Sequence, residues 1–164
     1  MTQTRTVMDE MASFVSAVNR LLENKASIDE DIELIKNSMY DTSELSAEQT
    51  RLTDELTLVA ELVQQAITEN STTALDQTEY QKRYDSLSER YNRTKGQLDT
   101  VTNEIAQKEL AKATLGEFQK TLRSQKELLT KFDEEAWYAL VDYATVYSMN
   151  DIRFTFKDGT KIKA

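Results

Sequence analysis

The sequence contains no cysteine and no histidine, and these two absences exclude several classes of chemistry. Without cysteine the chain can form no disulfide and offers no thiolate nucleophile. Without histidine it cannot build a Ser-His-Asp triad, and with neither residue it cannot form a Cys/His zinc site. These absences remove those classes of chemistry, and no other nucleophile or metal site emerges from the sequence, so we expect no catalytic residue, no metal ligand, no cofactor and no small-molecule substrate.

Proline is also absent, and glycine occurs only three times, whereas charged residues make up 30% of the chain. This composition suits long exposed helices better than a compact domain rich in loops. No stretch is apolar over the length of a membrane span, and "MTQTRTVMDEMASFV" lacks the apolar run of a signal peptide. We therefore expect a cytoplasmic protein without membrane contact.

The net charge of −9 is unevenly distributed along the 164 residues. Residues 152–164 hold four basic residues against one acidic residue, a local charge of +3, so the other 151 residues carry −12. The basic residues of this segment are Arg153, Lys157, Lys161 and Lys163. The overall charge argues against general affinity for nucleic acid, but the carboxyl-terminal segment is an exception.

Hydrophobic periodicity predicts helices at about 6–39, 43–69 and 77–126. The first carries a stripe made of Met11, Val15, Val18, Leu22, Ile28, Ile32, Ile35 and Met39. The third has the most regular seam, with steps of four and three, made of Tyr80, Tyr84, Leu87, Tyr91, Thr94, Leu98, Val101 and Ile105. Such a seam is typical of a coiled coil. Beyond it, Leu110, Leu115, Phe118 and Leu122 are expected to meet a different surface.

These helices are expected to form a long antiparallel coiled-coil hairpin, with its tip at about 69–76. Whether the chain breaks or only kinks near residues 39–43 stays open. The acidic clusters at 29–33 and 133–135 are interpreted as solvated helix faces, because a thin coiled coil offers no concave site for an acid/base pair.

The last 33 residues have a different pattern. Asp133 can cap a short helix that contains Trp137. Residue type and alternation predict strands at 143–148, 152–156 and 160–163, and the Asp-Gly pair at 158–159 predicts a hairpin turn. The fold class is therefore mainly α, with a coiled-coil arm over 1–131 and a helix plus a small antiparallel β-meander over 132–164.

The basic residues of the meander have two interpretations. Arg153 and Lys157 are an even number of residues apart, so they are expected on the same face, opposite the apolar residues of the strand. A basic face of this kind could contact the phosphate backbone of DNA. Alternatively, the lysines only protect the edge of the sheet against aggregation.

Three segments together resemble the carboxyl-terminal region of the large serine recombinases, the site-specific recombinases of phages and transposons. They are "FVSAVNRLLENKASIDEDIELIKNSMYDTSELSAEQTRLTDEL", "DQTEYQKRYDSLSERYNRTKGQLDTV" and "FDEEAWYALVDYATVYSMNDIRFTFKDGTKI". The resemblance covers almost the whole chain, and it depends most on the ordered series W-x-x-L-V, T-V-Y and F-T-F-K-D-G-T. In that family a coiled-coil hairpin is inserted in a zinc-ribbon domain that binds DNA.

The resemblance implies a non-catalytic module of a mobile-element recombinase that acts in DNA integration. Its catalytic domain and its zinc cysteines have no counterpart here, so zinc is expected only in a part of the domain that lies upstream. The implied partners are attachment-site DNA, bound within the intact protein, and other recombinase subunits or a second copy of this chain. The candidate DNA-backbone contacts are Arg153, Lys157, Lys161 and Lys163, and the candidate arm-tip contacts are Asn70, Thr72, Thr73 and Leu75.

Two alternatives remain beside this hypothesis. The chain could be a scaffolding coiled coil whose basic hairpin has no role in DNA binding. It could also be a regulatory fragment that pairs with the arms of an intact recombinase.

Overall fold

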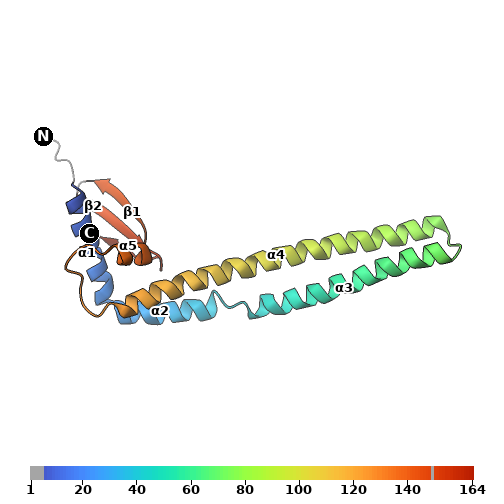
Figure 1. Ribbon diagram of the computed structural model, residues 1–164, viewed down its shortest axis with the longest axis horizontal. Coiled ribbons are helices and arrows are strands. Elements are labelled where there is room, and N and C mark those ends of the chain that lie inside the picture. Colours follow the sequence, from blue (N-terminus) through green and yellow to red (C-terminus); the bar gives the residue numbers. More distant parts are fainter. Residues whose placement is uncertain (1–5, 149) are drawn as a thin grey trace. The chain divides into compact units, whose positions relative to one another are not determined.

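The computed structural model describes residues 6–148 and 150–164 and is mainly helical, with 73% of these residues in helices (Figure 1). Long helices packed as an antiparallel hairpin, a short carboxyl-terminal helix and a three-stranded antiparallel sheet confirm the expected fold class. The elements are α1 (Val7–Glu23), α2 (Lys25–Ser38), α3 (Ser43–Thr72), α4 (Gln77–Ser124), α5 (Glu134–Leu140), β1 (Val141–Ser148), β2 (Asp151–Phe156) and β3 (Lys161–Lys163).

The chain divides into two compact units. The hairpin unit comprises 41–109, whereas the mixed unit combines 1–40 with 110–164. The boundary expected from the sequence lies at residue 131 instead. The two divisions differ because α1, α2 and the last turns of α4 share one hydrophobic core with α5 and the sheet.

In the hairpin unit, α3 packs antiparallel to α4, and their apolar seams face each other. Leu52, Val59, Ala66 and Thr94 are buried. Every predicted seam residue of α4 from Tyr80 to Ile105 is buried or half-buried, as a coiled coil requires.

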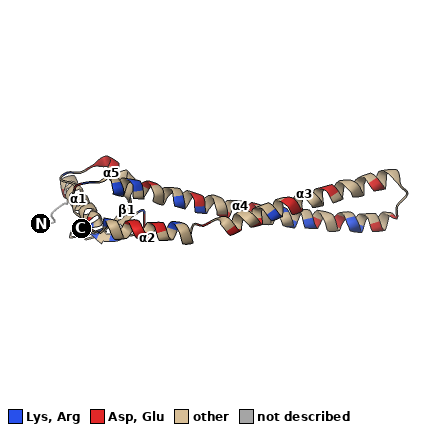
Figure 2. Cartoon of the chain, turned by 90° about the horizontal axis from the view of Figure 1, so that it is seen from below, with Lys and Arg blue, Asp and Glu red and all other residues tan. Residues whose placement is uncertain are grey.

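Ion pairs connect the two helices of the hairpin unit. Arg51 is the only basic residue of α3, whereas α4 carries both signs of charge along its length (Figure 2). Arg90 contacts Glu55 at 2.6 Å, and Arg83 contacts Glu69 at 2.7 Å near the tip. These half-exposed pairs contribute little free energy each, but they favour one pairing of the acidic α3 with the cations of α4.

In the mixed unit the strands form a sheet in the order β1-β2-β3, with both pairs antiparallel. Phe154 of β2 lies between Ala144 of β1 and Ile162 of β3. The pairing of β1 with β2 shifts register twice, near each end of β1. The inner face of the sheet joins α1 and α5 in one core, so the meander does not have to stand alone.

Phe14 of α1 is the centre of an aromatic cluster in that core. Its ring centroid lies 5.2 Å from those of Phe132 and Trp137, and 6.3 Å from that of Phe154. Trp137 and Phe154 also meet edge to face at 6.1 Å. Ring pairs at these separations and angles stabilise a core beyond the area they bury. The cluster connects α1 to a segment more than a hundred residues away.

The single helix expected at 6–39 is instead two helices, α1 and α2, which meet at Asn24. The Asn24 side chain donates to the carbonyl of Arg20 at 3.1 Å, a local bond that competes with continuous helix. The expected stripe is also partly wrong. Phe14 and Leu21 are fully buried, whereas Met11 and Met39 are 39% and 62% exposed, because α1 packs on the sheet and α2 on α4.

The carboxyl-terminal expectations are confirmed more closely. The Asp133 carboxylate accepts the backbone N–H of Ala136 at 2.8 Å and caps α5. The β2–β3 turn contains Gly159 with φ of 91°, in the left-handed region that favours glycine. Leu115, Phe118 and Leu122 of α4 are buried in the mixed unit, but Leu110 is 71% exposed, so its predicted burial is wrong.

Two leucines of α4 provide a matched test of this core. Leu122→Ala removes a fully buried side chain and should lower the free energy of unfolding by about 2–5 kcal/mol. Leu110→Ala removes an exposed one and should change it by less than about 0.5 kcal/mol. Urea unfolding followed by the fluorescence of Trp137, the only tryptophan, measures both. Equal effects of the two substitutions would contradict the assigned burial.

Glycine substitutions test the backbone. A Cβ at Gly96 would meet nothing within 4 Å, so Gly96→Ala should stabilise α4 by about 0.5–1 kcal/mol. The same space is open at Gly159, but its φ of 91° makes Gly159→Ala destabilising. Thermal unfolding by circular dichroism distinguishes the two. A fall in melting temperature for Gly96→Ala would indicate that the glycine has a role in bending the helix.

Candidate functional site

One face of the sheet points away from the core, and we call it the outer face. Arg153 and Thr155 of β2 alternate with Ile152, Phe154 and Phe156 of the core, so they point to the opposite side, where Arg153 is exposed and Thr155 is only 8% exposed. Register places Thr145 and Lys163 beside Arg153, and Tyr143 and Lys161 beside Thr155. The outer face thus consists of Tyr143, Thr145, Tyr147, Arg153, Thr155, Lys161 and Lys163, with Tyr147 placed there by its contact with Arg153.

Two of the four predicted DNA contacts share one carboxylate. The Arg153 guanidinium donates to both Asp151 oxygens, at 3.0 and 3.1 Å, and the Lys163 ammonium lies 3.6 Å from one of them. The hydrogen bond from Arg153 lowers the pKa of Asp151, and the charge of Lys163 adds to the effect. Because both cations remain about half exposed, a phosphate could still reach them in competition with Asp151.

The other two predicted contacts differ from each other. Lys161 lies exposed on β3, and among the described residues no ion-pair partner is found for its ammonium group. Lys157 does not share the face of Arg153, which corrects the expectation from even spacing. β2 ends at Phe156, and the Lys157 side chain turns back to donate to the carbonyl of Tyr138 in α5.

Tyr143 and Tyr147 are outer-face residues that were not singled out from the sequence. Their side chains are 50% and 64% exposed on β1. The Arg153 guanidinium stacks over the Tyr147 ring, 4.7 Å from its centroid, which is the geometry of a cation–π contact. The alternation Y-x-T-x-Y at 143–147 was a signal for these residues, because alternate positions of a strand share a face.

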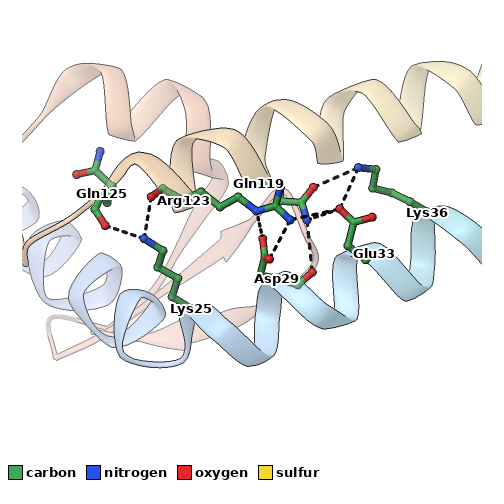
Figure 3. A network of polar contacts seen from close by, with 7 residues as sticks. All are labelled: Lys25, Asp29, Glu33, Lys36, Gln119, Arg123 and Gln125. Atoms are coloured by element: carbon green, nitrogen blue, oxygen red, sulfur yellow. Dashed lines mark hydrogen bonds and ion pairs between the residues drawn. The ribbon is translucent and has the colours of Figure 1, made fainter.

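A polar network within the mixed unit joins α2 to the end of α4 (Figure 3). The Gln119 side chain is 2% exposed, and its amide nitrogen donates to Glu33 at 2.8 Å while its oxygen accepts from Lys36 at 3.2 Å. Arg123 contacts Asp29 through two hydrogen bonds, at 2.6 and 2.9 Å. Asp29 and Glu33 therefore pair with α4, in contrast to the expectation of solvated helix faces.

The end of α4 and the loop after it are held by two side chains. Lys25 donates to the backbone carbonyls of Arg123 and Gln125, at 2.9 and 2.8 Å, and so places a cation at the carboxyl terminus of α4. Asn19 of α1 forms two hydrogen bonds with the backbone of Leu129, at 3.0 and 2.7 Å. These contacts fix the register of α4 against α1 and α2.

Of the arm-tip candidates, Asn70 and Thr72 lie in the last turn of α3, and Thr73 and Leu75 lie in its connection to α4. The Asn70 side chain accepts from Gln77 at 2.9 Å, and the Thr72 hydroxyl donates to the carbonyl of Thr68 at 2.9 Å. Thr73 is exposed, and Leu75 is half-buried. Thr73 therefore presents its side chain to solvent, whereas Asn70 and Thr72 also support the turn.

An apolar groove of about 280 Å³ lies in the mixed unit between the start of α1, α5 and the inner face of β1. Met11, Trp137 and Val146 are among its lining residues, and Glu10 is the one charged residue among them. The groove therefore offers no arrangement of polar groups for chemistry.

Among residues 6–148 and 150–164, no group of three or more acidic residues is arranged to hold a metal ion. No helix in this part of the chain combines the length and the hydropathy that a membrane span requires. Comparisons with protein-family models, with curated proteins and with solved structures find no match.

The α2–α4 network generates a prediction about pH. The hydrogen bond from Arg123 lowers the pKa of Asp29 in the folded protein, so this contact stabilises the fold above the ordinary carboxyl pKa and is lost as the pH falls through the lowered value. Asp29→Asn should therefore lower the urea midpoint at pH 7, and the difference from the native protein should shrink below about pH 4.

Glu30→Gln is the control, because it removes an exposed carboxylate one residue away. It should leave the urea midpoint nearly unchanged at both pH values. A loss of stability in Asp29→Asn that is equally large at pH 7 and at pH 3 would contradict the role of the Asp29 charge.

Proposed function

We propose that this chain is a non-catalytic module of a site-specific serine recombinase, with the α3–α4 hairpin contacting other subunits and the mixed unit belonging to a DNA-binding domain. The observation that supports this most is the order of the segments. The hairpin unit, 41–109, interrupts a mixed unit that is made from 1–40 and 110–164. A coiled-coil hairpin inserted in a small DNA-binding domain is the arrangement that the resemblance implies.

The charge distribution supports the assignment of DNA binding to the sheet. Lys161 and Lys163 of β3 and Arg153 of β2 lie on one face, in a chain whose net charge is −9. Cations gathered on one surface attract phosphate and release the counterions around it. DNA contact would then be confined to the mixed unit, and the acidic α3 would be kept from DNA by repulsion.

A scaffolding coiled coil is the second candidate, and one observation favours it. Asp151 already partners Arg153 and Lys163, and lysines on β3 are the usual protection of an exposed sheet edge. On that alternative the outer face binds no polyanion at any salt concentration.

A bridging experiment tests the proposal. One short DNA duplex is fixed on beads and a second, fluorescent duplex is in solution, at low salt. A chain that binds DNA through its sheet and itself through its arm should retain the second duplex on the beads. Thr73→Glu places a charge at the tip and should reduce this retention by about tenfold, while binding to a single duplex is unchanged.

Thr57→Glu is the matched control, because it adds the same charge to an exposed threonine of α3 away from the tip. It should bridge as the native chain does. Absence of duplex binding would favour the scaffold, whereas equal bridging by both variants would contradict the role of the tip. Incubation of the chain alone with supercoiled plasmid should produce no cleavage; nicking of the plasmid would refute its non-catalytic character.

A further inference from the structure

We propose that the outer face of the sheet binds single-stranded nucleic acid, with Tyr143 and Tyr147 stacking on bases and with Arg153, Lys161 and Lys163 contacting phosphates. This inference rests on the proposed function for the location of the DNA contacts, and it adds the form of nucleic acid that this face accepts. Contact with a duplex backbone requires only the cations, so the role of the two tyrosines is the new element.

Tyr143 and Tyr147 expose their rings on the outer face. Phe14 and Phe154 in the core of the same unit are 0% and 2% exposed, whereas Tyr143 and Tyr147 are 50% and 64% exposed on the opposite side of the sheet. A tyrosine ring offers a large rigid surface that loses little entropy when it is covered. Rings exposed in this way on a strand are suited to stacking with a flat ligand.

The two rings lie close to the cations of β2 and β3 on this face. Tyr143 lies in a row with Thr155 and Lys161, and the next row contains Arg153 and Lys163. Neighbouring strands are about 4.8 Å apart, so each ring on β1 lies within two strand spacings of a cation on β3. Aromatic rings flanked by a line of cations form a platform for successive bases and for the backbone that connects them.

The contact between Arg153 and Tyr147 enlarges the flat surface of this face. A guanidinium stacked 4.7 Å from the ring centroid extends the flat surface by a second planar group, and arginine itself stacks on bases. Asp151 keeps this guanidinium in place through two hydrogen bonds. The Asp151 carboxylate competes with phosphate for the Arg153 guanidinium. Lys161 has no ion-pair partner among the described residues, so it is the cation most available to the backbone of the nucleic acid.

Unpaired bases fit this surface better than a duplex does. In a duplex the base faces are stacked on one another and only their edges are accessible in the grooves. A single strand has exposed π-faces, and stacking on aromatic side chains tolerates any sequence. The connection between β2 and β3 is the short turn 157–160, which is too small to enter a major groove.

Fluorescence anisotropy with a labelled oligothymidylate, and separately with a duplex that contains it, tests the proposal on the full chain. Tyr143→Ala and Tyr147→Ala should each weaken binding to the single strand by about tenfold, with little effect on the duplex. Tyr147→Phe should bind as the native protein does, because it retains the ring. With three phosphate contacts, log K for the single strand should fall against log salt with a slope of about −2.

Tyr138→Ala is the matched control, because Tyr138 is 67% exposed in the same unit but belongs to α5. It should leave binding unchanged, and circular dichroism should show that all variants are folded. Absence of single-strand binding, or binding that Tyr143→Ala and Tyr147→Ala do not weaken, overturns the proposal. In either case duplex binding by the native chain would leave the proposed function standing, whereas its absence would count against both.

Discussion

The contact of Phe14 with Phe132, Trp137 and Phe154 is the interaction on which the rest of the mixed unit depends. A three-stranded sheet with a seven-residue helix buries too little apolar surface to be stable alone. α1 supplies the missing apolar surface, and the ring of its Phe14 is fully buried in the shared core. The beginning and the end of the described chain are therefore parts of one core, and each needs the other to be ordered.

This constraint gives the hairpin unit its place in the chain. Because 1–40 and 110–164 pack together, the residues between them leave the core and return to it. An antiparallel pair such as α3 and α4 achieves this return, and its seam provides its own stability. The polar network of Gln119, Arg123, Asp29 and Glu33 then sets the register where α4 joins the mixed unit. On the proposed function, this arrangement separates subunit contact from DNA contact along one chain.

Much of this could be predicted from the sequence, because helical and strand periods are local signals. The seam from Tyr80 to Ile105, the Asp133 cap and the Asp158-Gly159 turn were all identified from spacing and residue type. What spacing could not give is the partner of each face. Phe14 and Leu21 were missed because α1 packs against a sheet formed more than a hundred residues later, while Met11 and Met39 continued the stripe but remain exposed.

The candidate site shows the same limit. The basic residues were evident from composition, but Lys157 turns toward α5 because β2 ends one residue before it, a boundary that alternation cannot reveal. The capture of Arg153 and Lys163 by Asp151 depends on the register of β3 against β2. Tyr143 and Tyr147 became candidates only when the inner face was known, since the β1 register shifts twice and both sides of the strand carry apolar residues.

Native-state hydrogen exchange on the full chain tests the central claim that 1–40 and 110–164 form one unit, into which 41–109 is inserted. In low concentrations of denaturant, the amides of α1 should lose protection together with those of β2 and with the last turns of α4, at one common free energy of opening. The amides of α3 should open at a different free energy. Exchange of α1 at a free energy well below that of β2 would contradict the shared core.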